Sequence, residues 1–171
     1  MRFSTVALIL AAAGLFYGSD ATLPVPSNLK PDGLPLLSRT IFDELNRYTE
    51  SRSAALVDWH PTRREMLIST RFGDVSQLHR VAMPEGARQQ LTFFPDAVTS
   101  GSFNPTNGDE LEFSKDVGGG EFYQLYLQDL RAGTIRRLTE GDRSRNTGAV
   151  WSRDGKWIAY SSTARNGQDA D

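Results

Sequence analysis

From Ala54 to the end of the chain, apolar and polar residues alternate in short runs, which is the pattern of half-buried β-strands. Three such runs are Leu111–Ser114, Phe122–Leu127 and Thr134–Leu138. Glycine-containing stretches separate them, with Gly118–Gly120 after the first run and Ala132–Gly133 after the second. Because glycine supplies turn conformations, these stretches predict tight hairpin connections between consecutive antiparallel strands.

A short sequence motif, an aromatic residue followed by a polar turn, occurs three times along this part of the chain. The aromatic residues are Trp59, Phe103 and Trp151, which lie 44 and 48 positions apart. Two further motifs, Gln77–Val81 and Gln90–Thr92, are each repeated in similar form 47 positions later. A period of this size fits a repeat of four short strands and is typical of the blades of a β-propeller.

Residues 54–171 therefore predict an all-β fold made of two full four-stranded blades and half of a third. A propeller closes its ring with about 4–8 blades, so this stretch is expected to form an incomplete β-propeller. An open series of blades leaves an apolar face and strand edges uncovered. We expect the chain to be the front part of a longer polypeptide and, by itself, to aggregate or to be sensitive to proteases.

The aromatic residues that begin the three repeats are expected to fill the gaps between adjacent blades rather than to bind a ligand, because a large ring buries much apolar surface there. His60 aligns with Asn104 and Ser152, so its side chain is expected to bond the backbone of the turn that follows. His79 aligns with Tyr126, at an outward or interblade position. Neither histidine has the sequence neighbours of a catalytic base.

Residues 1–21 have the layout of a secretory signal peptide. Arg2 gives positive charge, an apolar run covers Val6–Phe16, and Ser19–Ala21 supplies the small residues of a cleavage site. The run is about half as long as the ~20 residues of a membrane-spanning helix, and an uncleaved anchor is the alternative. The mature protein is thus expected to begin near Thr22 and to be periplasmic or secreted, with no membrane span after cleavage.

Residues 22–53 are expected to form an extended lead-in that contains a short helix. Four prolines between residues 22 and 37 oppose regular structure there. Thr40 followed by Asp43 resembles a capping box, and Ile41, Leu45 and Tyr48 repeat with helical spacing. This pattern predicts a helix over about 40–48 that covers one end of the propeller.

Composition argues against several kinds of function. The chain has a formal net charge of −2, and without a basic excess nucleic acid is not expected as a partner. It contains no cysteine, so neither disulfides nor thiolate metal sites are possible. Asp142–Arg153 has the alternating oxygens of a calcium loop, but its glycine falls one position late and its last residue is not glutamate. No metal or other cofactor is therefore expected.

No catalytic residue is expected in this chain, because the Gly-x-Ser-x-Gly motif of a nucleophile elbow is absent and no Ser–His–Asp triad can be assigned. Val117–Glu121 resembles a phosphate-binding or oxyanion-hole loop. Neither a Lys-Ser/Thr pair nor a helix follows it, so a hairpin turn is favoured. Asp116 and Glu121 flank this turn and are the candidate substrate-binding residues, since their carboxylates could meet a substrate amine; solvated loop charges are the alternative.

Two stretches carry a resemblance to a known family. Trp151–Ser162, continued by Arg165–Asp171, resembles the propeller repeat shared by TolB-like proteins and the N-terminal domains of prolyl oligopeptidase family serine peptidases. Phe113–Tyr126 and Gln90–Asp96 are more similar to the exported bacterial peptidases of that family. The resemblance covers about residues 50–171 and extends to the propeller alone, since no part of the chain corresponds to an α/β-hydrolase domain.

The resemblance implies that the parent protein is a serine peptidase whose propeller limits peptide access to an α/β-hydrolase domain. This chain then contributes the first blades, meets peptide substrate only together with the missing blades and hydrolase domain, and is inactive alone. The alternative is a TolB-like periplasmic propeller that binds protein partners without catalysis. That alternative predicts a separate α/β domain before the repeats, for which residues 22–53 leave little room.

Overall fold

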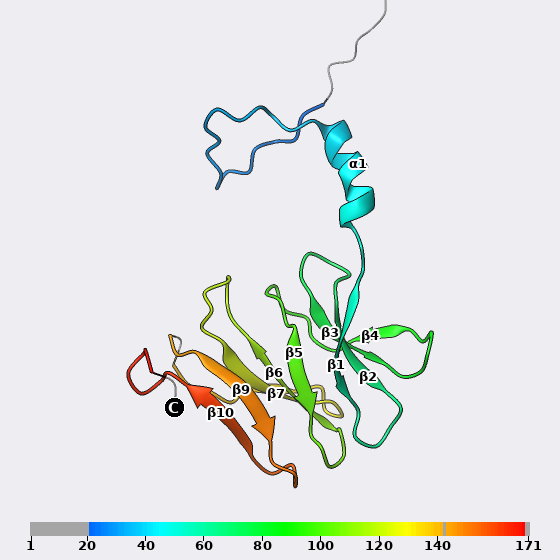
Figure 1. Cartoon of the computed structure of the whole chain (residues 1–171), viewed down its shortest axis with the longest axis vertical. Helices are drawn as coiled ribbons and strands as arrows, with labels where there is room; N and C mark the ends of the chain where they lie inside the picture. The colour runs from blue at the N-terminus through cyan, green and yellow to red at the C-terminus, as the bar shows by residue number, and fades with distance from the viewer. Residues whose placement is uncertain (1–20, 142, 170–171) are drawn as a thin grey trace, which may run out of the picture. The chain divides into compact units, whose positions relative to one another are not determined.

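The computed structural model describes residues 21–141 and 143–169, so the expected signal peptide lies outside the described residues except for Ala21. The chain divides after Ser51 into an N-terminal unit and a β-sheet unit that begins at Arg52. Figure 1 shows the helix of the first unit in cyan and the strands of the second in colours from green to red.

The N-terminal unit contains helix α1 (Arg39–Thr49), which is one residue longer at each end than the sequence predicts. Ser38 caps it, because its Oγ accepts a hydrogen bond from Ile41 N at 3.3 Å. The expectation that Thr40 begins a capping box is therefore wrong. The helix starts earlier, since Ser38 has the extended backbone that an N-cap needs and Thr40 is already helical.

Residues 22–37, which precede α1, close into a loop. Thr22 and Ser38 form an isolated antiparallel bridge, and Leu23 N donates to Leu37 O at 2.9 Å. Between these ends the backbone has only turns, bends and irregular segments, as expected for a proline-rich stretch. That α1 covers one end of a propeller stays a prediction.

The β-sheet unit consists of three antiparallel sheets (Figure 1), which confirms the predicted all-β fold. Blade 1 contains, in spatial order, β1 (Ala54–Trp59), β2 (Met66–Thr70), β3 (Gln77–Val81) and β4 (Arg88–Gln90). Blade 2 has the same order, with β5 (Ser100–Phe103), β6 (Glu110–Lys115), β7 (Gln124–Asp129) and β8 (Ile135–Arg137). Blade 3 begins with β9 (Asn146–Trp151) and β10 (Ile158–Ser162). Two four-stranded blades and half of a third are thus present, as predicted.

The same hydrogen bonds build the two complete blades. Leu78 N donates to Thr92 Oγ1 at 2.9 Å in blade 1, and Leu125 N donates to Thr139 Oγ1 at 3.0 Å in blade 2. Beside each of these bonds, the side-chain amide of a glutamine binds a backbone carbonyl of the loop after the fourth strand. Because Leu78 and Thr92 lie 47 positions before Leu125 and Thr139, the repeat in the sequence is a repeat of structure.

The hydrophobic core lies in the seam between blades 1 and 2. Its members, each at most 3% exposed, are Leu67, Leu78, Val98, Phe103, Leu111 and Phe113. The rings of Phe113 and Tyr126 stack with centroids 5.4 Å apart, and Phe94 packs at an angle against both. Leu111 and Phe113, two positions apart in β6, both belong to this core, in agreement with the period of two that predicts the strand.

Each aromatic residue at the end of the inner strand of blades 2 and 3 contacts the blade before it. Phe103 of blade 2 is buried, with its ring 5.0 Å from that of His60 in blade 1. Trp151 of blade 3 donates from Nε1 to Ser102 O of blade 2 at 3.3 Å. Trp59 has no preceding blade among the described residues, and 58% of it is exposed. Packing between blades is therefore confirmed for Phe103 and Trp151, and the expectation that Trp59 is packed is wrong.

A polar side chain holds the turn after each inner strand of the complete blades, as the sequence alignment predicts. In blade 1, His60 Nδ1 accepts hydrogen bonds from Thr62 N at 3.2 Å and Arg63 N at 3.1 Å. In blade 2, Asn104 Oδ1 accepts from Thr106 N at 3.1 Å. These bonds satisfy backbone donors that the turn leaves without a strand partner.

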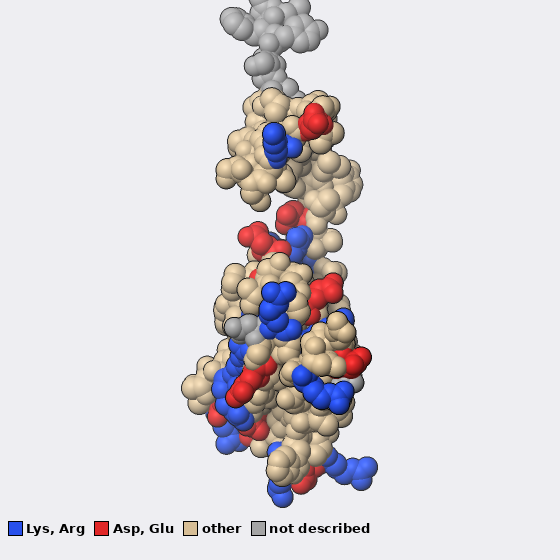
Figure 2. All heavy atoms as spheres, turned by 90° about the vertical axis from the view of Figure 1, so that its left-hand side faces the viewer, with Lys and Arg blue, Asp and Glu red and all other residues tan. Residues whose placement is uncertain are grey.

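Charges of both signs are mixed on the surface of the β-sheet unit. Figure 2 shows Lys and Arg atoms interspersed with Asp and Glu atoms on the face it presents, without a large area of one sign. In the part of the chain that the structure describes, no helix has the length and apolar character needed to cross a membrane.

Candidate functional site

The predicted substrate-binding residues Asp116 and Glu121 lie in the loop between β6 and β7. Glu121 N donates to Asp116 Oδ2 at 3.0 Å, so a single backbone hydrogen bond brings the two residues together. Asp116 is half-buried, whereas Glu121 is exposed and has a φ of 60°, a left-handed conformation that is uncommon for glutamate. Gly118–Gly120 between them forms the expected turn.

Lys115, a buried residue, fixes the shape of this loop. It is 5% exposed, and its Nζ donates to Asp116 O at 2.8 Å and to Asp96 Oδ2 at 3.4 Å. Asp96 Oδ1 accepts from Gly118 N at 2.9 Å. This backbone hydrogen bond and the nearby Lys115 hold the pKa of Asp96 below its usual value. The carboxylates of Asp96 and Asp116 thus stabilise the loop by accepting its backbone hydrogen bonds. Glu121 is the carboxylate that the loop presents to solvent.

A second feature is a cavity of about 230 Å³ between blades 2 and 3. Its polar wall consists of Ser100, Ser102 and Ser114 together with Glu112, and β9 closes the other side through Gly148 and Ala149. Glu112 is only 4% exposed. Ser102 Oγ donates to Glu112 Oε2 over a long 3.4 Å, while the hydroxyls of Ser100 and Ser114 lie 2.9 Å apart.

Burial raises the pKa of Glu112 to about 7, and the hydrogen bond from Ser102 opposes this effect only in part. The carboxyl group therefore changes its charge near neutral pH. None of the described residues that line the cavity is a lysine, arginine or histidine. The ionised form of Glu112 consequently has no basic side chain in the cavity wall to compensate its charge.

Sequence reasoning missed Glu112, because it lies within the run Leu111–Ser114, whose alternation predicts only a strand. The repeat nevertheless contains a signal. In every blade, a backbone hydrogen bond closes the turn between the first two strands, and the blades can be aligned through this bond. In the alignment, Glu112 takes the position of Leu67 in blade 1 and of Ala159 in blade 3. Leu67 is fully buried in the seam between blades 1 and 2. A carboxyl group where the other copies have apolar residues distinguishes this position from ordinary core.

The two histidines are structural. His60 is buried, and that burial, with the positive charge of Arg63, lowers its pKa. His79 is also buried, its Nδ1 lies 3.0 Å from Gln77 O, and its ring packs 5.3 Å from that of Phe72. Within the described residues, neither histidine is hydrogen-bonded to a serine or a carboxylate, and no group of three or more His, Cys, Asp or Glu side chains could hold a metal ion.

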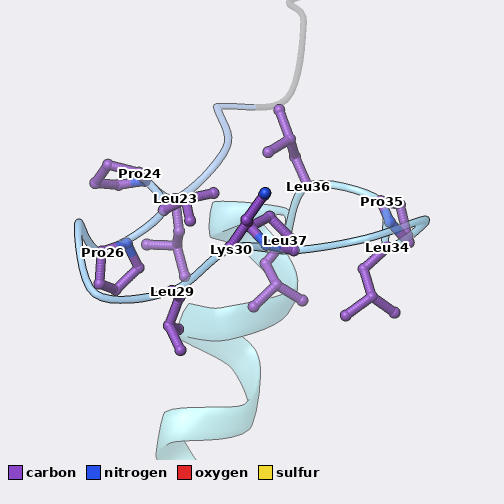
Figure 3. Close-up of a pocket in the computed structure, with 11 residues that line it drawn as sticks. Leu23, Pro24, Pro26, Leu29, Lys30, Leu34, Pro35, Leu36 and Leu37 are labelled. Atoms are coloured by element: carbon purple, nitrogen blue, oxygen red, sulfur yellow. The ribbon is translucent and has the colours of Figure 1, made fainter.

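The N-terminal unit has an apolar pocket of its own, with a volume of about 300 Å³. Figure 3 shows that leucine and proline side chains of the loop at residues 23–37 surround it, with Lys30 the charged residue among them. Leu34, Leu36 and Leu37 are more than 60% exposed. The pocket can accept apolar groups, but it brings together no set of polar side chains that could perform chemistry.

Successive antiparallel four-stranded blades, joined through an interblade core, define the fold of this chain as part of a β-propeller. No protein-family profile matches the chain, and no curated protein matches its sequence. Solved structures do match. One, described as a TolB from Agrobacterium tumefaciens, has a TM-score of 0.55 and 14% sequence identity over 68% of this chain and 41% of its own.

A second similar structure is TolB from Acinetobacter baumannii, with a TM-score of 0.45 and 16% identity over 67% of this chain and 32% of its own. At these identities the first match shows the fold, and activity does not follow from it. The chain spans less than half the length of either structure.

Proposed function

We propose that this chain forms the first blades of the propeller of an exported serine peptidase of the prolyl oligopeptidase family. In such a protein the propeller limits the access of peptides to an α/β-hydrolase domain, which supplies the catalytic residues. The observation that carries the proposal is the repeat of identical hydrogen bonds in blades 1 and 2, continued by β9 and β10, because this arrangement belongs to a ring of blades. The resemblance of Phe113–Tyr126 to exported peptidases supports the choice of family.

In this proposal the loop between β6 and β7 meets the substrate. Glu121 is exposed, and the bonds of Asp116, Asp96 and Lys115 hold its backbone in one conformation. A fixed, exposed carboxylate at a mouth of the ring suits an amino group of a peptide. The chain by itself contributes binding and no catalysis.

The proposal is tested on the native protein, isolated from its source with antibodies raised against the blades. We expect a protein larger than this chain, with an N-terminus near Thr22 after export, that reacts with a fluorophosphonate probe and cleaves short peptides. Intact mass, N-terminal sequencing and probe labelling measure the three properties. A native protein that ends with its last blade and is not labelled would overturn the peptidase proposal.

The second candidate is a TolB-like propeller that binds protein partners in the cell envelope without catalysis. The likeness to the Agrobacterium tumefaciens structure favours it. It predicts that the full-length protein is not labelled by the fluorophosphonate probe and contains a further α/β domain outside the propeller. The same mass and labelling measurements therefore separate the two candidates.

A further inference from the structure

The cavity between blades 2 and 3 places a buried carboxyl group next to open space. Glu112 is 96% buried. Among the described residues, its carboxyl group has one hydrogen-bond partner, Ser102 Oγ, at 3.4 Å from Oε2. A buried carboxylate is costly unless a cation or strong donors compensate it. The equivalent position in blade 1 avoids this cost, because Leu67 fills its seam with apolar contacts.

The polar groups of the cavity suit one kind of cation. A primary ammonium group has three N–H donors and needs three acceptors in a small volume. The Glu112 carboxylate and the hydroxyl oxygens of Ser102 and Ser114 are acceptors that line the same cavity. Calcium and magnesium prefer six or more oxygen ligands, in general with several carboxylates, and here one carboxylate is present.

The size of the cavity agrees with a small organic ion. Its volume of about 230 Å³ is far larger than the ~15 Å³ that a single bound water requires. Gly148 contributes no side chain to the wall formed by β9, and Ala149 contributes one methyl group, which leaves this side open for a short carbon chain. We propose that the cavity between blades 2 and 3 binds a small primary ammonium ion, with Glu112 as its counter-ion and the serine hydroxyls as further acceptors.

The test measures binding of methylammonium by equilibrium dialysis of the radiolabelled ion against the whole chain, a method that tolerates self-association. Binding requires ionised Glu112, so we expect it to be on the order of a hundredfold weaker at pH 5 than at pH 8. Tetramethylammonium at the same ionic strength is the matched probe, because it has the charge but no N–H donors, and it should not bind.

Two variants locate the site. Glu112→Gln keeps the shape of the side chain and should weaken methylammonium binding about tenfold or more, because the charge-assisted hydrogen bond is lost. Ser102→Val leaves the carboxyl group in place, fills part of the cavity, and should also reduce binding. Glu140→Gln, which removes an exposed carboxylate in the loop after β8, is the control and should bind like the wild type.

Near-UV circular dichroism establishes that each variant is folded. The proposal is overturned if methylammonium binding is absent, if tetramethylammonium or sodium competes equally well, or if folded Glu112→Gln binds with unchanged affinity. Each of these results concerns the ammonium site alone and leaves the proposed peptidase function untouched.

Discussion

His60 and Asn104 hold equivalent turns with different side chains. His60 accepts two backbone hydrogen bonds through Nδ1, and Asn104 accepts its backbone bond through Oδ1. An amide cannot be protonated in the physiological range, but an imidazole can, and protonation at Nδ1 removes the acceptor. Of these two side chains, only His60 can therefore lose its hydrogen bonds to the turn by protonation in acid.

Replacing His60 by asparagine should remove a part of the acid sensitivity of the fold. Because the folded state lowers the pKa of His60 from 6.5, its neutral form stabilises the protein fully above pH 6.5, and this stabilisation is lost as the pH falls toward the lower pKa. We expect the free energy of unfolding of His60→Asn to depend less on pH below 6.5 than that of the wild type. Urea unfolding in dilute solution, followed by tryptophan fluorescence, measures the difference, and parallel curves would contradict it.

Glu112 has the opposite pH dependence. Its folded-state pKa lies at about 7, above the ordinary 4.5, so its contribution to stability is fully present below about pH 4.5 and is lost as the pH rises through 7. Relative to Glu112→Gln, the wild type should lose on the order of 3 kcal/mol of unfolding free energy between pH 4.5 and 8. The same unfolding measurement, made without added amines, tests this; a difference that does not change with pH would show that Glu112 is not buried as described.

At the scale of the turns and strands, two glycines with nearly the same backbone conformation have different surroundings. Gly108 has a φ of 70° and Gly133 one of 71°. A Cβ at Gly108 would lie 2.2 Å from His60 Nε2, whereas nothing lies within 4 Å of a Cβ at Gly133. The first glycine lets the turn of blade 2 pack against blade 1, and the second only serves its own hairpin.

Substitution by alanine should separate these two requirements. Gly133→Ala carries the cost of a left-handed alanine, about 1 kcal/mol of unfolding free energy. Gly108→Ala carries a similar backbone cost and also displaces the ring of His60, so we expect it to destabilise the protein by a further 1–3 kcal/mol or so. Chemical denaturation of both variants gives the comparison, and equal losses would show that the seam adapts at no cost.

The strands and turns could be predicted from the sequence because their signals are local. The alternation of apolar and polar residues predicts a strand around Phe113, and the glycines of Gly118–Gly120 predict a hairpin turn. Neither prediction depends on the rest of the fold. The sequence pattern places the capping residue of α1 at Thr40, two residues late, since both Ser38 and Thr40 have side chains that can cap a helix. The cavity beside Glu112 could not be predicted from one strand, because it depends on the distance between two blades.

At the scale of the whole β-sheet unit, blade 1 has one face covered by blade 2 and another that carries exposed apolar residues. Trp59 and Leu56 are each more than half exposed in β1, although the equivalent Phe103 is buried. A patch of this kind is a site where another chain can associate. The sequence repeat predicts such a face, but which aromatic residue becomes exposed follows only from the order of the blades.

We expect the chain to self-associate at micromolar concentration, and Trp59→Lys should weaken this association. Trp157→Lys is the matched control. Trp157 is 74% exposed, and it occupies the turn position of Glu65 and Glu110 in the other blades rather than the inner-strand position of Trp59. Sedimentation velocity measures the mass of the particles. A monomer at all concentrations, or equally weakened self-association in both variants, would contradict the role of the exposed face of blade 1 that carries Trp59.

The exposed ring of Trp59 also gives the protein a built-in optical reporter. Indole emission moves to shorter wavelengths when water leaves its surroundings, and a blade that docks on this side of β1 would produce such a change. Trp151 already contacts blade 2, so its emission should stay constant. In a longer polypeptide that carries Trp157→Phe, the wavelength of tryptophan emission would therefore report ring closure, when the last blade packs against blade 1.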